Sequence, residues 1–379
     1  MAGALGSALG AFRPSSRVYA TVFLERNPYL SWETQRPVFQ HPVWSGVVHP
    51  HLPHWGTSES AGTENLCDED SATTATRRAS GKQASTRRAG VSSSTRPSEP
   101  TSESRSWLPR VARLSPTEAQ TLPPFHVQTI SGSLCRDAND AQHLIRAASD
   151  AGASTLLCVT GDTTKTNGKS ERIDSLTLLR FAREMKRSGD VDDEINIACV
   201  ANPCLETAMG NGIGAISLER KIQAGAEMVI TQPEVVPELG RRWREEISNE
   251  LGLFRVDGSE TEIEMISGIS VATSEATSKR WMTLVFGDGW DARFEGTEAG
   301  SLIQAVLREL SVAENTLDKE TFKNWVVERS ELHCAGALLS PTNSYHGLHV
   351  MPVTVAGYES AGVLADSIAT LVEVRDTGR

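Results

Sequence analysis

Four short apolar segments between residues 125 and 233 constrain the fold more than any other feature of this sequence. Each is rich in apolar residues, and we interpret the four as parallel strands buried on both faces. The segments are 125–133, 155–162, 195–202 and 226–233. Between them lie segments with helical periodicity, as in 139–153. Such a string of strand–helix units folds either into a closed βα barrel or into an open doubly wound sheet.

In both folds the chemistry lies at the carboxyl ends of the strands, on loops that a rigid scaffold holds in place. Polar or glycine residues stand at those ends in this sequence, and we expect them to face one another. They are Arg136, Asp137, Gly161, Asp162, Asn202, Pro203, Thr231 and Gln232.

Four stretches resemble, in their order and approximate spacing, the methylenetetrahydrofolate reductase family. They are CRDAND (135–140), VTGD (159–162), VANP (200–203) and ERKIQAGAEMVITQP (219–233). EMISGIS (264–270) and GLHVMPV (347–353) resemble later strands of that family more weakly. The resemblance covers 125–233 well, 260–373 loosely and the first 120 residues not at all. It implies an α/β fold of the (β/α)8 barrel type, with FAD as cofactor and NADH or NADPH as reductant. The implied reaction reduces 5,10-methylenetetrahydrofolate to 5-methyltetrahydrofolate, in one-carbon and methionine metabolism.

The resemblance also implies roles for residues at the substrate end of the site. Asp162 matches a catalytic Asp beside the isoalloxazine and the folate head, where a negative charge favours a cationic iminium. Gly161 would let the backbone approach the flavin ring. Gln232 matches a Gln that hydrogen-bonds the folate head, since an amide both donates and accepts. The structural alternatives are a Gly-Asp pair that ends a strand and caps a helix, and a Gln satisfied at a strand end.

On the flavin side, Arg220 and Lys221 match an Arg-Lys pair near the pyrophosphate, where a cation neutralises the phosphates. Asn202 is the remaining residue that we expect near the cofactor. A basic pair on a helix is otherwise most often a solvated face. We expect no metal site. The histidines at 49, 51 and 54 predict a Pro-rich loop, because a metal would need further ligands and a fixed backbone.

The sequence departs from the family pattern at several points. The family's catalytic acid is a Glu on the first strand, in a Glu-Phe-Phe-Pro-Pro type motif, and residues 1–124 contain no such motif. Glu25 and Glu33 are carboxylates in that unmatched stretch. Leu134 stands where the family has a flavin-contacting Thr, and Val355 where the last strand supplies an Arg.

Composition divides the chain into three parts. Residues 1–57 predict either a transit peptide or diverged first strands, with a strand near 19–24. Residues 58–113 are rich in Ser, Thr and Arg, and predict a disordered linker. Residues 114–379 predict the barrel domain. Only six strands are predicted after residue 124, whereas a closed barrel needs eight, so the barrel could be incomplete.

Charge and cysteine content exclude some classes of function. Residues 114–379 hold 24 Lys and Arg against 39 Asp and Glu, an acidic balance that argues against a nucleic-acid partner. No apolar run is long enough to cross a bilayer. The six cysteines include no CxxC pair, which favours reduced structural thiols. We therefore expect a cytoplasmic protein or, through its N-terminal segment, an organellar one, with a small-molecule partner and compatible with a homo-oligomer.

Three classes of function fit these observations. The first is an active flavin reductase whose first two strands have diverged within residues 15–55. The second is a non-catalytic relative that binds flavin or folate as a regulatory module. The third is another βα-barrel enzyme, such as a Schiff-base lyase acting through Lys221, which we rank last because Lys221 lies in a predicted helix.

Overall fold

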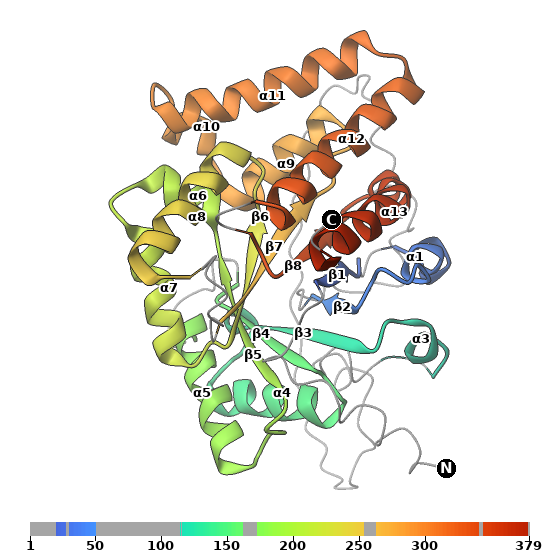
Figure 1. Ribbon diagram of the computed structural model, residues 1–379. Helices are drawn as coiled ribbons and strands as arrows, with labels where there is room; N and C mark the ends of the chain where they lie inside the picture. The colour runs from blue at the N-terminus through green and yellow to red at the C-terminus, as the bar shows by residue number, and fades with distance from the viewer. Residues whose placement is uncertain are drawn as a thin grey trace, which may run out of the picture. The chain divides into compact units, whose positions relative to one another are not determined.

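The computed structural model shows a closed barrel of eight parallel strands in chain order, surrounded by helices (Figure 1). The described residues are 20–27, 30–50, 114, 116–161, 173–253, 263–340 and 344–377. All of them belong to one compact unit. The strands are β1 (Thr21–Glu25), β2 (Gly46–His49), β3 (Phe125–Ser131), β4 (Thr155–Val159), β5 (Asn196–Ala201), β6 (Met228–Pro233), β7 (Glu264–Ser270) and β8 (Gly347–Met351). The prediction of a (β/α)8 barrel is confirmed.

The expectation of an incomplete barrel is wrong, because residues 20–50 supply the two missing strands. β1 pairs with β8 on one side and with β2 on the other, and β2 pairs with β3, so these strands close the ring. His49 is the last residue of β2, not part of a Pro-rich loop as predicted. His51, His54 and the predicted linker 58–113 lie outside the described residues, as does the N-terminal segment before residue 20.

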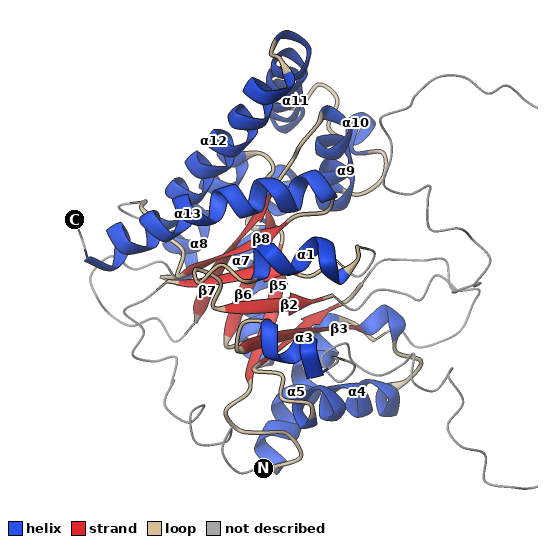
Figure 2. Cartoon of the chain, turned by 90° about the vertical axis from the view of Figure 1, so that its right-hand side faces the viewer, coloured by secondary structure: helices blue, strands red, loops and turns tan. Residues whose placement is uncertain are grey.

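The helices surround the strands, as Figure 2 shows. In chain order they are α1 (Trp32–Phe39), α3 (Pro116–Thr121), α4 (Ala138–Asp150), α5 (Ser175–Ser188), α6 (Pro203–Met209), α7 (Ile213–Ala224), α8 (Pro237–Leu251), α9 (Glu275–Phe286), α10 (Trp290–Arg293), α11 (Glu298–Thr316), α12 (Lys319–Leu338) and α13 (Val355–Thr377). A short 3-10 helix, η3 (Gly132–Leu134), follows β3. Side-chain caps fix several helix starts, as where Asp174 accepts from the Thr177 N–H and Ser274 from that of Thr277. None of the described helices is long and apolar enough to cross a bilayer.

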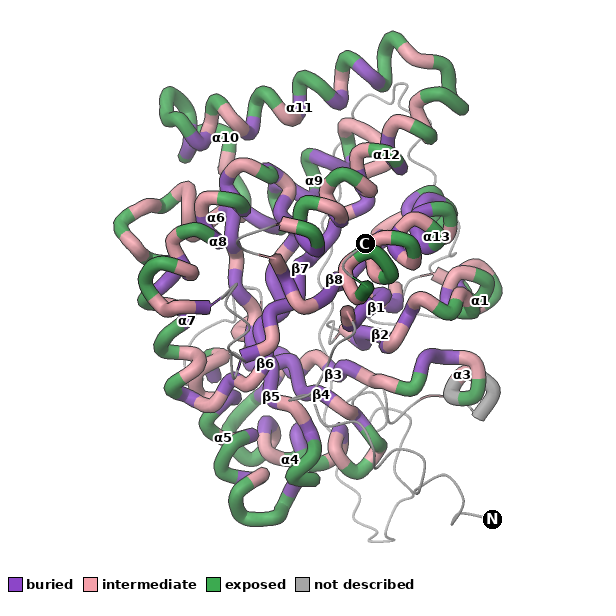
Figure 3. Tube along the Cα trace, viewed as in Figure 1, coloured by how far each residue is buried: buried purple, intermediate pink, exposed green. Residues whose placement is uncertain are grey.

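Strand side chains alternate between two apolar layers, and Figure 3 shows the strands as the most buried part of the fold. One layer fills the barrel and includes Phe23, Val48, Leu157 and Met228. The other packs between strands and helices. Five of the six cysteines are described, and all five are buried free thiols, as expected; Cys67 lies outside the described residues. Burial raises the pKa of the Cys199 thiol to about 12, which fits a structural role.

A third apolar cluster lies on the β6 and β7 side of the barrel. It joins α6 and α8 to α9 and α11 through Val236, Leu239, Met282, Phe286 and Ile303. Helix α11 packs against α9 and α12. These helices therefore form an extra layer beside the ends of β6 and β7.

Candidate functional site

The carboxyl ends of all eight strands meet at one mouth of the barrel, because the strands are parallel and adjacent in a closed ring. Gly161, Asn202 and Gln232 follow or end β4, β5 and β6 and so lie at this mouth. Asp162, the predicted catalytic residue, lies outside the described residues. The described part of the mouth therefore includes the residues at strand ends that were predicted to bind cofactor or substrate, but not the predicted catalytic Asp.

Gly161 has a positive φ of 78°, which favours glycine. A Cβ at this position would lie 2.0 Å from Ser131 Oγ and 2.2 Å from Ser133 Oγ. Nearby, the Ser133 N–H donates to the carbonyl of Thr160 at 2.8 Å. The close approach between the β4 end and the β3 end thus requires glycine here for a structural reason. The predicted approach of the Gly161 backbone to a flavin ring stays a prediction, in addition to this structural reason.

Asn202 uses both ends of its amide to fix the surrounding helices. Its Oδ1 accepts from the Leu205 N–H at 3.1 Å and caps α6, while its Nδ2 donates to the Val285 carbonyl of α9 at 2.7 Å. These bonds use one of the two N–H donors and one of the two lone pairs of the amide, so they fix the direction of the side chain. Asn202 therefore positions α6 and α9, a role that the sequence did not reveal.

Gln232 lies where the ladder between β6 and β7 is interrupted. The regular pairing of the two strands breaks between Ile230 and Pro233, and the Gly268 N–H donates to Thr231 Oγ1 at 2.9 Å. Among the described residues, the Gln232 amide has no hydrogen-bond partner, and the residue is partly exposed. Bulges of this kind re-aim side chains near active sites. Gln232 can therefore both donate and accept toward a ligand.

The two predicted basic residues differ in their surroundings on α7. Arg220 is exposed. Lys221 is half-buried, and its Nζ donates to the Val200 carbonyl of β5 at 2.7 Å. An ammonium has three donors, so this bond leaves Lys221 able to contact an anion as well. Lys221 lies on helix α7 and not at a strand end, which is the reason for ranking a Schiff-base lyase last among the three classes of function.

A carboxylate that the motif comparison did not align lies inside the mouth on the first strand. Phe23 belongs to the layer inside the barrel, and Glu25, two residues later, faces the same way. His349 of β8 also faces inward, because it pairs with Phe23 while its neighbours Leu348 and Val350 pack outward. His349 Nε2 lies 3.3 Å from Glu25 Oε2. The other candidate, Glu33, is exposed in the first turn of α1.

The backbone around Glu25 is held firmly. Tyr358 of α13 donates its hydroxyl to the Glu25 carbonyl at 2.5 Å and accepts from the Asn27 N–H at 2.7 Å. The next residue, Arg26, is buried, pairs with Glu118 and lies 5.3 Å from the centre of the Trp32 ring. The Glu25 side chain itself is 28% exposed. A carboxylate on a fixed strand end with access to the mouth meets the geometric requirement for an acid or base.

No protein-family model and no curated protein matches this chain. Among solved structures, it is similar to an uncharacterized protein from Clostridium thermocellum that binds two copies of 5-methyl-5,6,7,8-tetrahydrofolic acid. The TM-score is 0.42 and the identity 12%, over 92% of this chain and 94% of that one.

Two further similarities are to a 2,3-dimethylmalate lyase of the PEP mutase/isocitrate lyase superfamily and to a phosphonopyruvate hydrolase. Both have a TM-score of 0.36 and 12% identity, over 82% and 84% of this chain and 90% and 93% of theirs. At this level the comparisons concern the barrel fold alone.

Proposed function

We propose that the chain is a flavin-dependent oxidoreductase that reduces 5,10-methylenetetrahydrofolate to 5-methyltetrahydrofolate with FAD and NADH or NADPH. The observation that carries the proposal is the Glu25 carboxylate, inside the barrel at the end of β1 beside His349. The resemblance to methylenetetrahydrofolate reductases implies a catalytic Glu on the first strand. Glu25 supplies a carboxylate on that strand although the surrounding motif is absent.

The described residues have hydrogen-bonding capacity that fits such ligands. The Gln232 amide can donate and accept at one edge of a heterocycle, as a folate head requires. Lys221 keeps donors for a phosphate beyond its bond to Val200. When bound, FAD would supply the hydride chemistry. In this proposal Glu25 gives the proton that helps to open the five-membered ring of the substrate, and Asp162 favours the cationic intermediate.

The remaining assignments follow the same proposal. Gly161 would face the flavin ring, while Arg220 and Lys221 would lie toward the phosphates. Asn202 would act on the site indirectly, through the positions of α6 and α9. The purified full chain should therefore retain flavin. Lys221→Ala should weaken flavin binding about ten- to a hundredfold, as expected for the loss of one charge-assisted contact.

Stopped-flow measurement of the two half-reactions tests the activity. We expect NADH or NADPH to reduce the bound flavin, and methylenetetrahydrofolate to reoxidise it faster than it reoxidises free flavin. A protein that neither retains flavin nor gains it on titration would contradict the whole proposal. A flavoprotein that is reduced by nicotinamide, but not reoxidised by the folate, would instead be the non-catalytic binding module.

A further inference from the structure

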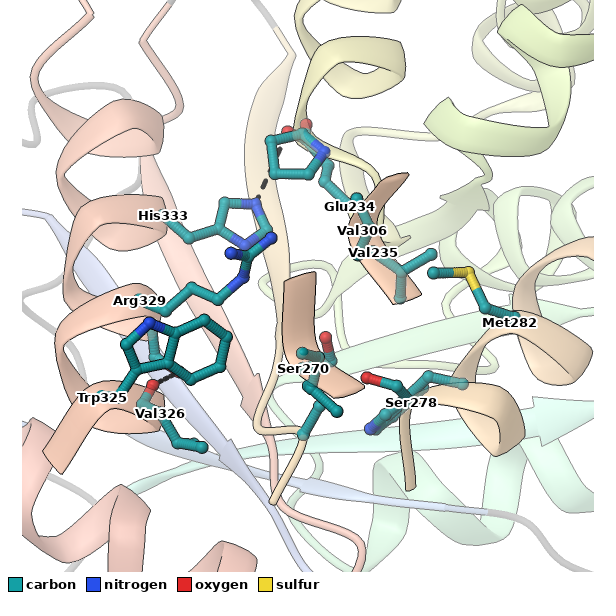
Figure 4. A pocket seen from close by; sticks show the side chains of 15 residues that line it. Glu234, Val235, Ser270, Ser278, Met282, Val306, Trp325, Val326, Arg329 and His333 are labelled. Carbon is teal, nitrogen blue, oxygen red and sulfur yellow. Dashed lines mark hydrogen bonds and ion pairs between the residues drawn. The ribbon is translucent and has the colours of Figure 1, made fainter. Parts of the chain in front are cut away.

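A second site lies outside the barrel mouth, between the ends of β6 and β7 and helices α9, α11 and α12. It is a cavity of about 70 Å³, and Figure 4 shows the side chains that line it. Ser270 comes from β7, Ser278 and Trp281 from α9, and Arg329 and His333 from α12. Of these residues only Ser270 belongs to a stretch that resembles the reductase family, the weakly matching EMISGIS (264–270).

The carboxylate at the end of this cavity is ionised and already has partners that offset its charge. Glu234 is 1% exposed; its Oε2 accepts from Arg244 Nη1 at 2.5 Å and its Oε1 from the Tyr345 hydroxyl at 2.5 Å. Burial alone would raise its pKa, but His333 and Arg244 outweigh burial and lower the pKa to about 2. Glu234 therefore stays ionised, and Arg244, which does not line the cavity, offsets its charge.

The other polar groups of the cavity are mainly donors without partners. The Trp281 ring is 4% exposed, yet its Nε1–H donates to no described residue. His333 Nε2 lies 3.7 Å from Glu234 Oε2, too far for a hydrogen bond, and has no other partner in the described part of the chain. The hydroxyls of Ser270 and Ser278 point toward the centre of the cavity in Figure 4. A buried donor without an acceptor costs about 1–3 kcal/mol, so this lining is incomplete without an acceptor.

Arg329 gives the cavity a cation at its rim. Its guanidinium lies 5.3 Å from the centre of the Trp325 ring, and its side chain is 31% exposed and pairs with Glu309. A guanidinium held by an aromatic ring keeps its planar fork of donors in a fixed direction. Hydrogen-bond donors therefore line the inside of the cavity, and the Arg329 cation lies at its edge.

We propose that this cavity binds a small oxyanion, such as inorganic phosphate or a short carboxylate. An oxyanion offers only acceptors, which is what the donors of Trp281, Ser270 and Ser278 lack, and Arg329, although paired with Glu309, adds a positive charge at the rim. The size agrees: a cavity of about 70 Å³ is several times the roughly 10–15 Å³ that a single water needs, so it has room for a ligand larger than water. The loop after the seventh strand is also a frequent phosphate-binding position in barrels of this type.

Isothermal titration calorimetry of the full chain with inorganic phosphate, sulfate and acetate tests the proposal. We expect saturable binding of at least one anion. Trp281→Phe keeps the ring and removes only the N–H, so it should weaken that binding about ten- to a hundredfold. The matched control is Trp44→Phe, because Trp44 Nε1 donates to the Val38 carbonyl at 2.8 Å away from this cavity, and its removal should leave anion affinity unchanged.

Ser278→Ala and Arg329→Gln give independent readings if Trp281→Phe fails to fold, and each should weaken binding. A preference for phosphate and sulfate would identify a tetrahedral ligand, and a preference for acetate a carboxylate; both support the proposal. The absence of saturable binding by all three anions would overturn it. So would binding that none of the cavity variants weakens, because the anion would then lie elsewhere.

Discussion

Two Glu–His pairs lie near the carboxyl ends of the barrel strands, and their surroundings are opposite. Glu25 is 28% exposed and approaches one side chain, His349, at 3.3 Å. Glu234 is 1% exposed and is bound by Arg244 and Tyr345, with His333 at 3.7 Å. The residue types are the same, but only Glu25 has both access to the mouth and room for another partner.

This contrast separates a carboxylate that can exchange a proton from one that holds the fold together. Two strong donors fix Glu234 as a buried anion whose pKa is about 2. At neutral pH it cannot act as an acid. Exposure and the number of donors, rather than the presence of a histidine, therefore decide which of the two carboxylates suits the proposed proton transfer.

Glu25→Gln tests the catalytic half of the comparison and should have the largest effect. We expect flavin reoxidation by methylenetetrahydrofolate to slow about 10²–10⁴-fold, since a positioned acid is lost, while flavin reduction by nicotinamide stays unchanged. Stopped-flow absorbance measures both steps. Glu33→Gln, on the exposed face of α1, is the control and should behave like the parent protein. Equal rates in the two variants would remove Glu25 from the mechanism.

Glu234→Gln tests the structural half. The amide keeps the shape of the side chain, but leaves the Arg244 charge buried and unpaired, so unfolding should require about 3–5 kcal/mol less free energy. Urea denaturation gives this value. Glu238→Gln removes a partly exposed carboxylate that pairs with Arg241 and Arg242, and should cost less than about 1 kcal/mol. If both variants lose the same stability, the buried cluster does not support the fold.

Acid should remove the same stabilisation. The folded-state pKa of Glu234 is lowered from 4.5 to about 2, so the unfolded chain binds its proton first as pH falls. The contribution is fully present above pH 4.5 and is lost as pH falls toward 2. It should amount to on the order of 3 kcal/mol. The stability difference between the parent protein and Glu234→Gln should therefore shrink over this window, and a constant difference would contradict the assignment.

Tyr345→Phe should have the smallest effect of the four. It deletes one donor to the Glu234 carboxylate, and a bond to a charged acceptor contributes about 1.5–3 kcal/mol. Tyr358→Phe is the matched change beside Glu25, where the hydroxyl donates to a neutral carbonyl, and should cost about 0.5–1.5 kcal/mol. Thermal unfolding of the two variants compares the two regions directly. Tyr345→Phe should lose more stability than Tyr358→Phe, and the reverse order would contradict the comparison.

The later six strands could be predicted because their signal is local. The predicted segments 125–133 and 264–270 contain the observed strands Phe125–Ser131 and Glu264–Ser270. β2 (Gly46–His49) was missed because four residues beside Pro and His carry no distinct pattern. Only pairing with β1 and β3 makes that segment a strand.

The candidate site was predicted less completely. Sequence order placed Gly161, Asn202 and Gln232 at strand ends, and the barrel brings those ends to one mouth. It did not reveal that the Asn202 amide is already used by Leu205 and Val285. Nor did it distinguish Glu25 from Glu33, since the choice depends on which of them follows an inward-facing residue of a strand.

The sequence by itself determined the succession of strands and helices, because apolar runs and helical periodicity act over a few residues. Tertiary structure alone decided how the carboxylates differ. Glu25 meets His349 across 324 positions of the chain, through the pairing of β1 with β8. Glu234 meets Tyr345 across 111 positions, through α8, α12 and the approach to β8. Such partners are set by the closure of the ring and by helix packing, so the role of each carboxylate exists only in the folded protein.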